Sequence, residues 1–581
     1  MATLNSRKAA EHLTVSRFCG LKQASAVSDQ GASMMRNFRI LEDGSLEKRC
    51  GYRVLHNLTA PIRGVWEGTL NGETLFFAVG GNTVYRKSAD ETLPRSIYRL
   101  TTSSGRVTFF VFRNRLYLLD GVSALIYLPA MESFSVSEGY TPLYGKNWHP
   151  TSMGKVNEPV NLLQNRVRIH YLNTASSTVF QLPFTAKQID RVYLDGKAVT
   201  AYGFTPETST FSIESTQATA RSVEVAFVRS DAFDQRNTVL SGCTAALYTD
   251  PLHETVLVYG SSPYTVYCSR RVTDDMLSEC ARFYTATDPF YLPQDNTFAV
   301  GSPTHPITCV CQYHKQALVF NRQSVWAIHY PAPSDEDPDA SNDDPDIYLL
   351  SSGIGCSSRG GVLPCGNNLA TVHLGEIYLM SNQVNDPSFC TFQQITQDLQ
   401  DTSQDSFSAN SLLYYRERSD QLWWFDPTSP NGVIRIYDKR NAIWFTYDGI
   451  PANDFFELNG ELCFSTDSGS IYLFDETEEY DNGNRITAIY QSHYLEPRRP
   501  ELPKRCLQVC LGASVGAGEL TLELDTDRGH YPLSLGGTCD LTPDLFNRRV
   551  TLGKFRFLRY RIVSQSVERC RIHFLSILAN N

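Results

Sequence analysis

One pattern recurs along this chain: a short apolar run, a tight polar corner, and a second short apolar run. Residues 307–329, ITCVCQYHKQALVFNRQSVWAIH, contain three such runs separated by two polar corners. Runs of aromatic and β-branched residues between turn residues are typical of antiparallel hairpins. The sequence therefore predicts a mainly β protein. The same pattern returns in further segments, namely 62–85, 106–128, 253–268, 368–380, 411–447 and 454–474.

Helical periodicity is nearly absent, and the best candidates for helices are two short segments, 6–14 and 273–281. Consecutive meanders of three or four strands are the building blocks of β-propellers. The repeats here are degenerate, and the Gly-His…Trp-Asp signature of one common propeller class is missing. We therefore predict a divergent β-propeller, and stacked β-sandwiches are the alternative that fits the same pattern.

Two segments differ from the meanders. Residues 155–235 have longer strands with cleaner alternation and an Asp-Gly turn at 195–196, which predicts an inserted β-sandwich. Long strands also follow the proline-rich stretch EPRRPELP at 496–503, which indicates a C-terminal β-sandwich-like module. The predicted order is an N-terminal arm (1–55), first propeller blades (56–154), the inserted β-sandwich (155–235), remaining blades (236–488) and the C-terminal β module (489–581).

The charge of the chain argues against tight binding of nucleic acid. The net charge is −10 and no basic run is present, whereas proteins that grip DNA carry a basic face. The longest charge cluster is acidic and spans 333–346. Its alternating aspartates resemble the start of a calcium loop, but Ala340 and Asp346 stand where glycine and glutamate are needed. We predict a solvated acidic loop and no metal site.

No motif in the chain predicts catalysis. Residues 512–516, GASVG, match the nucleophile elbow around Ser514, but a strand pattern follows where the elbow needs a helix. Close cysteine pairs such as Cys309 and Cys311 lack a second zinc knuckle, so we expect packed core cysteines. We predict no enzyme, no catalytic residue and no cofactor. The sequence also lacks a signal-peptide pattern and any long apolar stretch, so we expect folding in the cytoplasm and no membrane segment.

The segment 18–55 resembles the opening of a known family. Its elements are Gly20-Leu21-Lys22-Gln23, Asn37-Phe38, Asp43-Gly44-Ser45-Leu46 and Lys48-Arg49-Cys50-Gly51-Tyr52. Residues 256–273, 306–329 and 354–381 add strand pairs that occur in the same order in that family. The chain is similar to the tail stabilisation and tail nozzle proteins of short-tailed bacteriophages. Cys50 stands where the family motif usually has a proline.

The resemblance implies a structural role in the virion. Such proteins form a ring, usually of six copies, below the portal and its adaptor; the ring extends the DNA conduit, retains the genome and docks fibres or a tip. It would assemble in the cytoplasm of the bacterial host, and DNA would pass through without specific binding. The alternatives are a carbohydrate- or surface-binding propeller and a glycosidase-type propeller enzyme.

Two sets of residues follow as candidates for this role. We expect the N-terminal arm to reach a neighbouring subunit or the adaptor, with Arg36, Lys48 and Arg49 as charged anchors. The alternative for these three is solvated surface charge. The acidic loop is a candidate to face the lumen of the conduit, through Asp335, Glu336, Asp337, Asp339, Asp343, Asp344 and Asp346.

Overall fold

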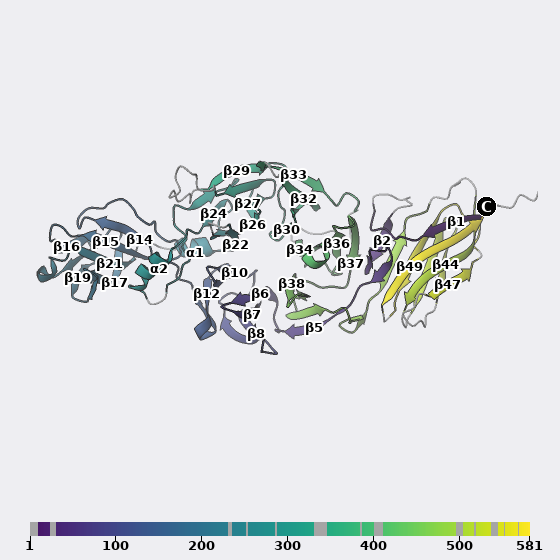
Figure 1. Cartoon of the computed structure of the whole chain (residues 1–581), viewed down its shortest axis with the longest axis horizontal. Helices are drawn as coiled ribbons and strands as arrows, with labels where there is room; N and C mark the ends of the chain where they lie inside the picture. Colours follow the sequence, from purple (N-terminus) through teal and green to yellow (C-terminus); the bar gives the residue numbers. More distant parts are fainter. Residues whose placement is uncertain are drawn as a thin grey trace, which may run out of the picture. The chain divides into compact units, whose positions relative to one another are not determined.

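The protein is mainly β, as predicted: of its described residues, 56% are in strands and 5% in helices. It forms two compact units (Figure 1): unit 1 comprises 1–62 and 356–581, and unit 2 comprises 63–355. Each unit is built from several small sheets. The computed structural model describes residues 10–23, 31–230, 235–250, 254–284, 287–330, 345–383, 386–399, 411–495, 503–515, 519–535, 544–550, 552–566 and 569–580.

Unit 2 contains four antiparallel meanders of four strands, and neighbouring meanders share hydrophobic cores. The segment 307–329 folds as predicted into three of these strands, β26, β27 and β28. The strands are β6 (Ile62–Leu70), β7 (Glu73–Gly80), β8 (Thr83–Ser88) and β9 (Arg95–Arg99); β10 (Thr108–Phe112), β11 (Arg115–Leu119), β12 (Ala124–Leu128) and β13 (Ser133–Val136); β22 (Thr244–Thr249), β23 (Glu254–Tyr259), β24 (Thr265–Cys268) and β25 (Thr297–Ala299); β26 (Ile307–Tyr313), β27 (Gln316–Asn321), β28 (Val325–His329) and β29 (Asp346–Ser351).

The inserted module begins earlier than residue 155, because β14 joins its larger sheet as a parallel neighbour of β15. Its two sheets share one core, in which Phe180 of the smaller sheet packs with Ile169 of the larger. The larger sheet contains β14 (Leu143–Trp148), β15 (Arg166–Leu172), β21 (Ser222–Arg229), β17 (Ala186–Leu194) and β18 (Lys197–Val199). The smaller sheet contains β16 (Val179–Gln181), β20 (Thr210–Ile213) and β19 (Tyr202–Thr205).

The helices are short. The prediction of a helix at 273–281 is confirmed by α2 (Asp274–Ala281), which Thr273 caps by accepting a hydrogen bond from the backbone of Met276. The prediction for 6–14 is wrong over residues 10–14, which belong to a strand; residues 6–9 lie outside the described part. The other helical segments are η1 (Pro129–Met131), η2 (Ser215–Gln217), α1 (Gln235–Leu240) and η3 (Glu417–Ser419).

Unit 1 contains three further meanders of four strands, and the last of them takes its fourth strand from the N-terminal region. β5 (Tyr52–Asn57) pairs antiparallel with β40, so a segment near the start of the chain completes the sheet. The strands are β30 (Val362–Cys365), β31 (Asn368–His373), β32 (Glu376–Gln383) and β33 (Asp386–Gln394); β34 (Leu412–Arg416), β35 (Gln421–Phe425), β36 (Ile434–Asp438) and β37 (Ile443–Tyr447); β38 (Asp454–Leu458), β39 (Glu461–Ser465) and β40 (Ser470–Phe474) with β5, extended by β41 (Tyr480–Asp481) and β42 (Asn484–Arg485).

The rest of unit 1 interleaves strands from both ends of the chain. β1 (Ala10–Val15) pairs with β49 (Cys570–Asn580), and β2 (Ala32–Arg36) lies between β37 and β43 (Ala488–Ser492). The described part of the predicted N-terminal arm is therefore built into the sheets of unit 1. The remaining strands are β3 (Phe38–Ile40), β4 (Leu46–Lys48), β44 (Arg505–Val515), β45 (Leu520–Thr526), β46 (Gly529–Ser534), β47 (Asp544–Arg549) and β48 (Leu558–Ser564).

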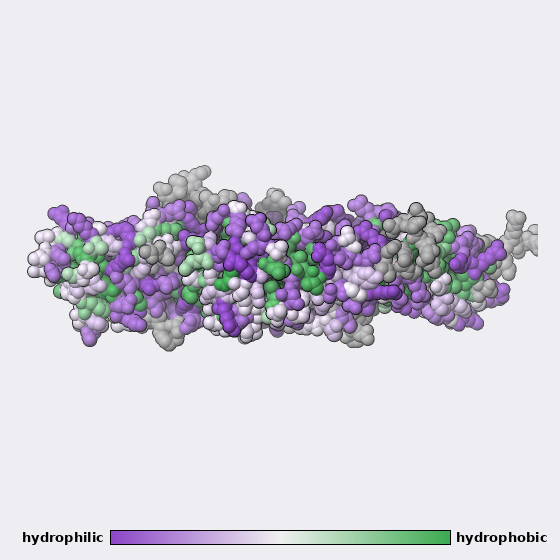
Figure 2. Space-filling model, turned by 90° about the horizontal axis from the view of Figure 1, so that it is seen from below, coloured by the Kyte–Doolittle hydropathy of each residue, from purple (hydrophilic) through white to green (hydrophobic). Residues whose placement is uncertain are grey.

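Local sequence explains the hairpins and their buried faces. Asn71 and Gly72 both have positive φ, of 52° and 86°, as a type I′ turn requires, and Asn459-Gly460 repeats this geometry. In β45 every second residue is buried, from Leu520 to Leu524, which is the period of a sheet with one covered face. Hydrophilic residues cover most of the face seen in Figure 2, with smaller hydrophobic areas between them.

Candidate functional site

Arg49 and Asp481 form a buried ion pair in unit 1, within the motif that carries the family resemblance. The two nitrogens Nη1 and Nη2 of Arg49 donate to the two carboxylate oxygens of Asp481 at 2.8 and 2.5 Å. The Arg49 side chain is 2% exposed and that of Asp481 is 9% exposed. Burial opposes the charged guanidinium, but the hydrogen bonds that Arg49 donates to Asp481, and the charge of that carboxylate, outweigh it and raise the pKa of Arg49. We call this pair the clamp, because it joins the segment after β4 to β41.

Asn37 supports the clamp from the turn between β2 and β3. Its Oδ1 accepts hydrogen bonds from Nε of Arg49 at 2.8 Å and from the backbone N–H of Asp448 at 3.0 Å. Its Nδ2 donates to the Asp448 carboxylate and to the Thr487 carbonyl. The residue has φ of 56°, a left-handed conformation that asparagine tolerates better than most residues. The asparagine of the Asn37-Phe38 motif thus fixes this turn.

Gly51 allows the closest backbone approach in this region. A Cβ added there would lie 2.0 Å from the carbonyl oxygen of Tyr480, so only glycine fits against β41. Its N–H donates to the carbonyl of Glu478. The motif residues Asn37, Arg49 and Gly51 therefore hold β41 against the N-terminal strands.

The three predicted anchor residues have partners within unit 1. Lys48 and Arg49 are 4% and 3% exposed, and Lys48 donates from Nζ to the carbonyl of Ser566 at 2.5 Å. Arg36 is half-buried and lies 3.5 Å from the Asp448 carboxylate. Because Lys48 and Arg49 are buried inside one chain, they are neither solvated surface charges nor side chains that reach a second subunit. Sequence reasoning identified their importance but not their partners, which lie hundreds of residues away.

A polar pocket of about 280 Å³ opens beside the clamp and has Lys48 and Arg49 in its wall. Cationic side chains outnumber anionic ones around it. Trp423, Leu462 and Phe474 contribute apolar surface. The cations are Arg39, Lys48, Arg49, Arg416, Arg418 and Arg569, and the anions are Glu47, Glu461, Asp475 and Glu476.

Cys50 also lines this pocket and is half-buried. Burial raises the pKa of its thiol, while Arg49, Arg39 and Arg416 act in the opposite direction. The thiol is therefore protonated near neutral pH and is a slow nucleophile. Chemical labelling of Cys50 can therefore report whether the pocket is accessible.

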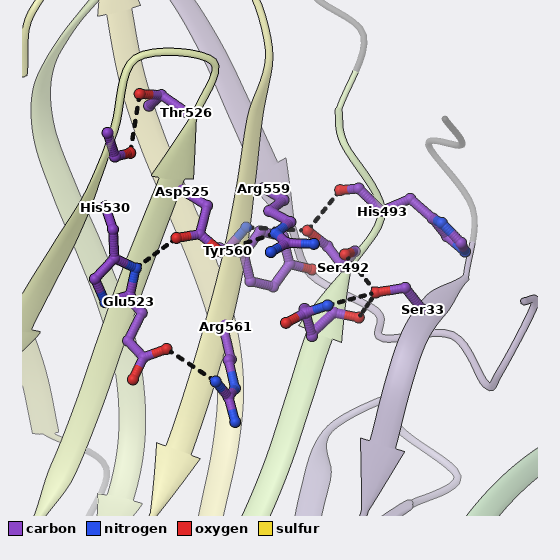
Figure 3. A network of polar contacts seen from close by, with 12 residues as sticks. Ser33, Ser492, His493, Glu523, Asp525, Thr526, His530, Arg559, Tyr560 and Arg561 are labelled. Carbon is purple, nitrogen blue, oxygen red and sulfur yellow. Dashed lines mark hydrogen bonds and ion pairs between the residues drawn. The ribbon is translucent and has the colours of Figure 1, made fainter. Parts of the chain in front are cut away.

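A second polar cluster crosses the nine-stranded sheet of unit 1 (Figure 3). Asp525 of β45 binds His530 of β46 at 2.5 Å and Nε of Arg559 of β48 at 2.8 Å, and Glu523 accepts from Arg561 at 3.4 Å. These residues stand directly opposite one another in the strand register. The cluster therefore fixes the register of three strands.

The same cluster continues toward the N-terminal strand β2. The Ser33 hydroxyl donates to the carbonyl of Ser492 at 2.9 Å, and the Ser492 hydroxyl accepts from the backbone N–H of Tyr560 at 3.1 Å (Figure 3). These bonds between neighbouring strands are those expected of a structural network.

Ser514, the serine of the elbow-like motif, lies inside β44 and is 8% exposed. Its Oγ is 2.8 Å from Nε2 of His573 in the neighbouring strand. Burial and the nearby Arg571 lower the pKa of His573, which favours a neutral ring. A nucleophile elbow places its serine at a turn between strand and helix, whereas Ser514 pairs with Arg571 within a sheet. We assign the contact to strand pairing.

Other predicted sites give little chemistry. Of the predicted acidic loop residues, only Asp346 is described; it is exposed and pairs with His329 at the start of β29. The other six lie outside the described residues. The fourteen described cysteines, Cys309 and Cys311 included, are thiols and not disulfides, and no group of metal-ligating side chains occurs in the described ranges. No described helix is long and apolar enough to cross a membrane.

A cleft of about 710 Å³, larger than the pocket beside the clamp, lies in unit 2 between the β10–β13 sheet and the base of the inserted module. Asp288 in its wall accepts hydrogen bonds from Tyr117 and Ser137, and Arg166 of the wall pairs with Glu138 and Asp190. These polar groups are engaged with one another, so they serve the attachment of the inserted module.

Comparison with known proteins assigns no family. No family model matches the chain, and no curated protein matches it. Among solved structures, the chain is similar to a protein of unknown function from Desulfotomaculum acetoxidans DSM 771, with 9% identity, a TM-score of 0.31 and coverage of 70% of this chain and 95% of that one. It is also similar to the AfRom2 CNH domain, with 8% identity, a TM-score of 0.34 and coverage of 73% and 99%. Neither likeness assigns a fold or a function to this chain.

Proposed function

We propose that this chain is a structural protein of the tail of a short-tailed bacteriophage. In this proposal, copies of the chain form a ring, a homo-hexamer in the simplest case, that extends the DNA conduit and retains the genome. The portal adaptor would bind one side of the ring, and fibres or a tip protein would bind the other. The chain would act as a virion component and not as an enzyme.

One observation carries the proposal: several residues that make the N-terminal segment resemble this family have strict structural demands. Asn37 has a left-handed backbone and four hydrogen bonds, Arg49 is buried in the clamp, and Gly51 faces a backbone oxygen. A resemblance that rested on common strand residues alone would have no reason to coincide with such positions. In this proposal, the motif holds the N-terminal strands against β41 in this chain and has the same task in the family.

We further propose that the meanders belong to one divergent β-propeller. Five separate sheets have four strands, and two larger sheets each contain a further four-stranded meander. Within each unit, the first strands of successive meanders are neighbours, β10 with β22 and β22 with β26, then β30 with β34 and β34 with β38. Completion of the last meander by β5 is a common way for a propeller to close. This architecture would supply a stiff body for a conduit wall.

The charge of the chain is compatible with a conduit. A wall that must release DNA should not neutralise its phosphates, and a net charge of −10 opposes such binding. We retain the proposal that the acidic loop around Asp335–Asp346 faces the lumen. Replacing its seven acidic residues by Asn or Gln should then change DNA retention or ejection, and unchanged ejection would count against this detail.

The test of the proposed function is immunogold labelling of purified particles from an infected lysate, with antibody against this chain. Gold at the tail, below the capsid vertex, is the expected result. Recombinant protein should also form rings of fixed symmetry in negative-stain images and by native mass spectrometry. Particles that lack the chain would overturn the proposal, and binding to a glycan array would then favour a carbohydrate-binding protein.

A further inference from the structure

We infer that the pocket beside the clamp binds a phosphate group, supplied by the free ion or by a phosphomonoester. This inference goes beyond the proposed function and stands whether or not the chain belongs to a tail. It begins from the fixed pairs around the pocket: Arg39 with Glu47 at 2.5 Å and Arg49 with Asp481 at 2.5 Å. Asp475 faces Arg53 at 3.2 Å. These groups neutralise one another.

Four cations remain after these pairs, and none of them forms an ion pair with a described carboxylate. Arg416 is half-buried and Arg418 is exposed, and neither side chain makes an ion pair or a hydrogen bond within the described ranges. Arg569 donates only to a backbone carbonyl, that of Glu476. The remaining anions, Glu461 and Glu476, are exposed. The pocket therefore has unused guanidinium donors, which match the oxygens of a phosphate.

Lys48 is the strongest indication, because its charge is buried and only partly satisfied. The side chain lines the pocket at 4% exposure and has one hydrogen bond, to the Ser566 carbonyl. An ammonium group has three donors, and a buried charge without a counter-charge is costly. Within the described residues no carboxylate forms an ion pair with Lys48. An anion in the pocket would supply the missing counter-charge.

The volume and polarity of the pocket restrict the kind of ligand that it can bind. A volume of about 280 Å³ is near the lower end of the range for small-molecule pockets, so the pocket fits a small oxyanion and not a duplex or a folded segment. The buried rings of Trp423 and Phe474 lower the local dielectric and strengthen charge interactions at that end. A dianionic phosphate gains more from several cations than a chloride ion does.

The test uses Cys50 as a reporter inside the pocket and exposed Cys19 as an internal control. The intact chain is alkylated with N-ethylmaleimide in the presence of phosphate, AMP, adenosine or NaCl alone, and NaCl brings every sample to the same ionic strength. Peptide mass spectrometry then gives the alkylation rate at each cysteine. We expect phosphate or AMP to slow alkylation of Cys50 at least threefold, while adenosine and NaCl leave it unchanged and Cys19 reacts at the same rate throughout.

Matched variants separate binding from general charge effects. The double variant Arg416→Gln/Arg418→Gln removes two cations whose side chains make no ion pair or hydrogen bond within the described ranges, so it should fold normally and lose the protection of Cys50. Because Arg416 acts on the pKa of Cys50, each alkylation rate is compared with the ligand-free rate of the same variant. Arg485→Gln, an exposed arginine of the same unit outside the pocket, should keep it. Calorimetric titration with phosphate should give a binding signal in the wild type and in Arg485→Gln only.

The possible outcomes are distinct. If both phosphate and AMP protect Cys50, the pocket binds phosphate and the free ion is a sufficient ligand. If AMP alone protects Cys50, the pocket binds a phosphomonoester. Protection that persists in Arg416→Gln/Arg418→Gln, or no protection by either compound, would overturn the inference. Failure of immunogold labelling would not affect this result, so the two proposals are tested separately.

Discussion

Arg49 and Asp481 lie 432 positions apart in the sequence and meet as a doubly hydrogen-bonded ion pair inside unit 1. Asn37 holds the third nitrogen of the same guanidinium. One turn near the start of the chain is thereby fixed to a short strand late in it.

Breaking the clamp should be strongly destabilising. Arg49→Met leaves the buried Asp481 without its counter-charge, which costs about 3–5 kcal/mol of unfolding free energy. Denaturant titration of the variant and the wild type measures the loss. The control is Arg53→Gln, which breaks the more exposed pair with Asp475 and should cost no more than about 1 kcal/mol. Equal losses in the two variants would contradict the assigned role of the clamp.

Asn37 should show two separable contributions. Asn37→Gly loses the four side-chain hydrogen bonds but keeps the left-handed turn without strain. Asn37→Ala loses the same bonds and also strains the backbone, because a residue with a Cβ disfavours positive φ. It should therefore be less stable than Asn37→Gly by about 1–2 kcal/mol. Thermal unfolding of both variants gives the difference. If Ala and Gly are equally stable here, φ of 56° is not a constraint.

Gly51→Ala tests the close approach to β41. The added Cβ would meet the Tyr480 carbonyl, so the backbone must move, at a cost of about 1–3 kcal/mol or more. The matched control is Gly353→Ala, because nothing lies within 4 Å of its Cβ position and its φ is not positive. The control should stay within about 0.5 kcal/mol of wild type. Similar melting temperatures for the two variants would refute the steric argument.

Asp43 should make stability depend on pH in the acid range. Hydrogen bonds from the Ser45 hydroxyl and backbone N–H, then the bond from Arg571, lower its pKa to about 2. Because this folded pKa is below the unfolded value of about 3.9, the stabilisation is complete above pH ~4 and is lost as the pH falls toward 2. Asp43→Asn should therefore melt below wild type at pH 6, with the gap closing near pH 2. A gap that does not change with pH would contradict this.

Asp525 should contribute more than its neighbour Glu523 to the cross-strand cluster. Burial opposes its ionisation, but hydrogen bonds from His530 and Arg559 outweigh this and lower its pKa. Asp525→Asn weakens two cross-strand pairs, each worth about 0.2–1 kcal/mol, whereas Glu523→Gln weakens one. Urea titration at pH 6 should rank Asp525→Asn below Glu523→Gln. The reverse order would show that the cluster in Figure 3 does not fix strand register.

Features that depend on local sequence were predictable. The hairpins of 307–329 follow from short apolar runs and polar corners, and α2 follows from the segment beginning at Thr273. The strand β1 was missed because its partner lies at the other end of the sequence, and this pairing overrides the weak helical preference of residues 10–14.

The candidate site was only half predictable for the same reason. The motif 48–52 indicated Lys48 and Arg49 as important charges, but their burial depends on Ser566 and Asp481. The pocket combines Arg39, Arg416 and Arg569, which come from three distant segments and share no spacing. No pattern within a single segment reports that such side chains meet.

The pairing of β1 with β49 also has a consequence for the order of synthesis. Thr14 and Ser576, whose hydroxyls meet across these strands, are 562 positions apart. A ribosome that adds about 5–20 residues per second would expose β1 for roughly half a minute or more before its partner emerges. During that time the unpaired strand offers its edge to any other nascent chain. Unit 1 can thus complete this pairing only after β49 has been synthesised, and a chaperone that shields the first strands would raise the yield of folded protein.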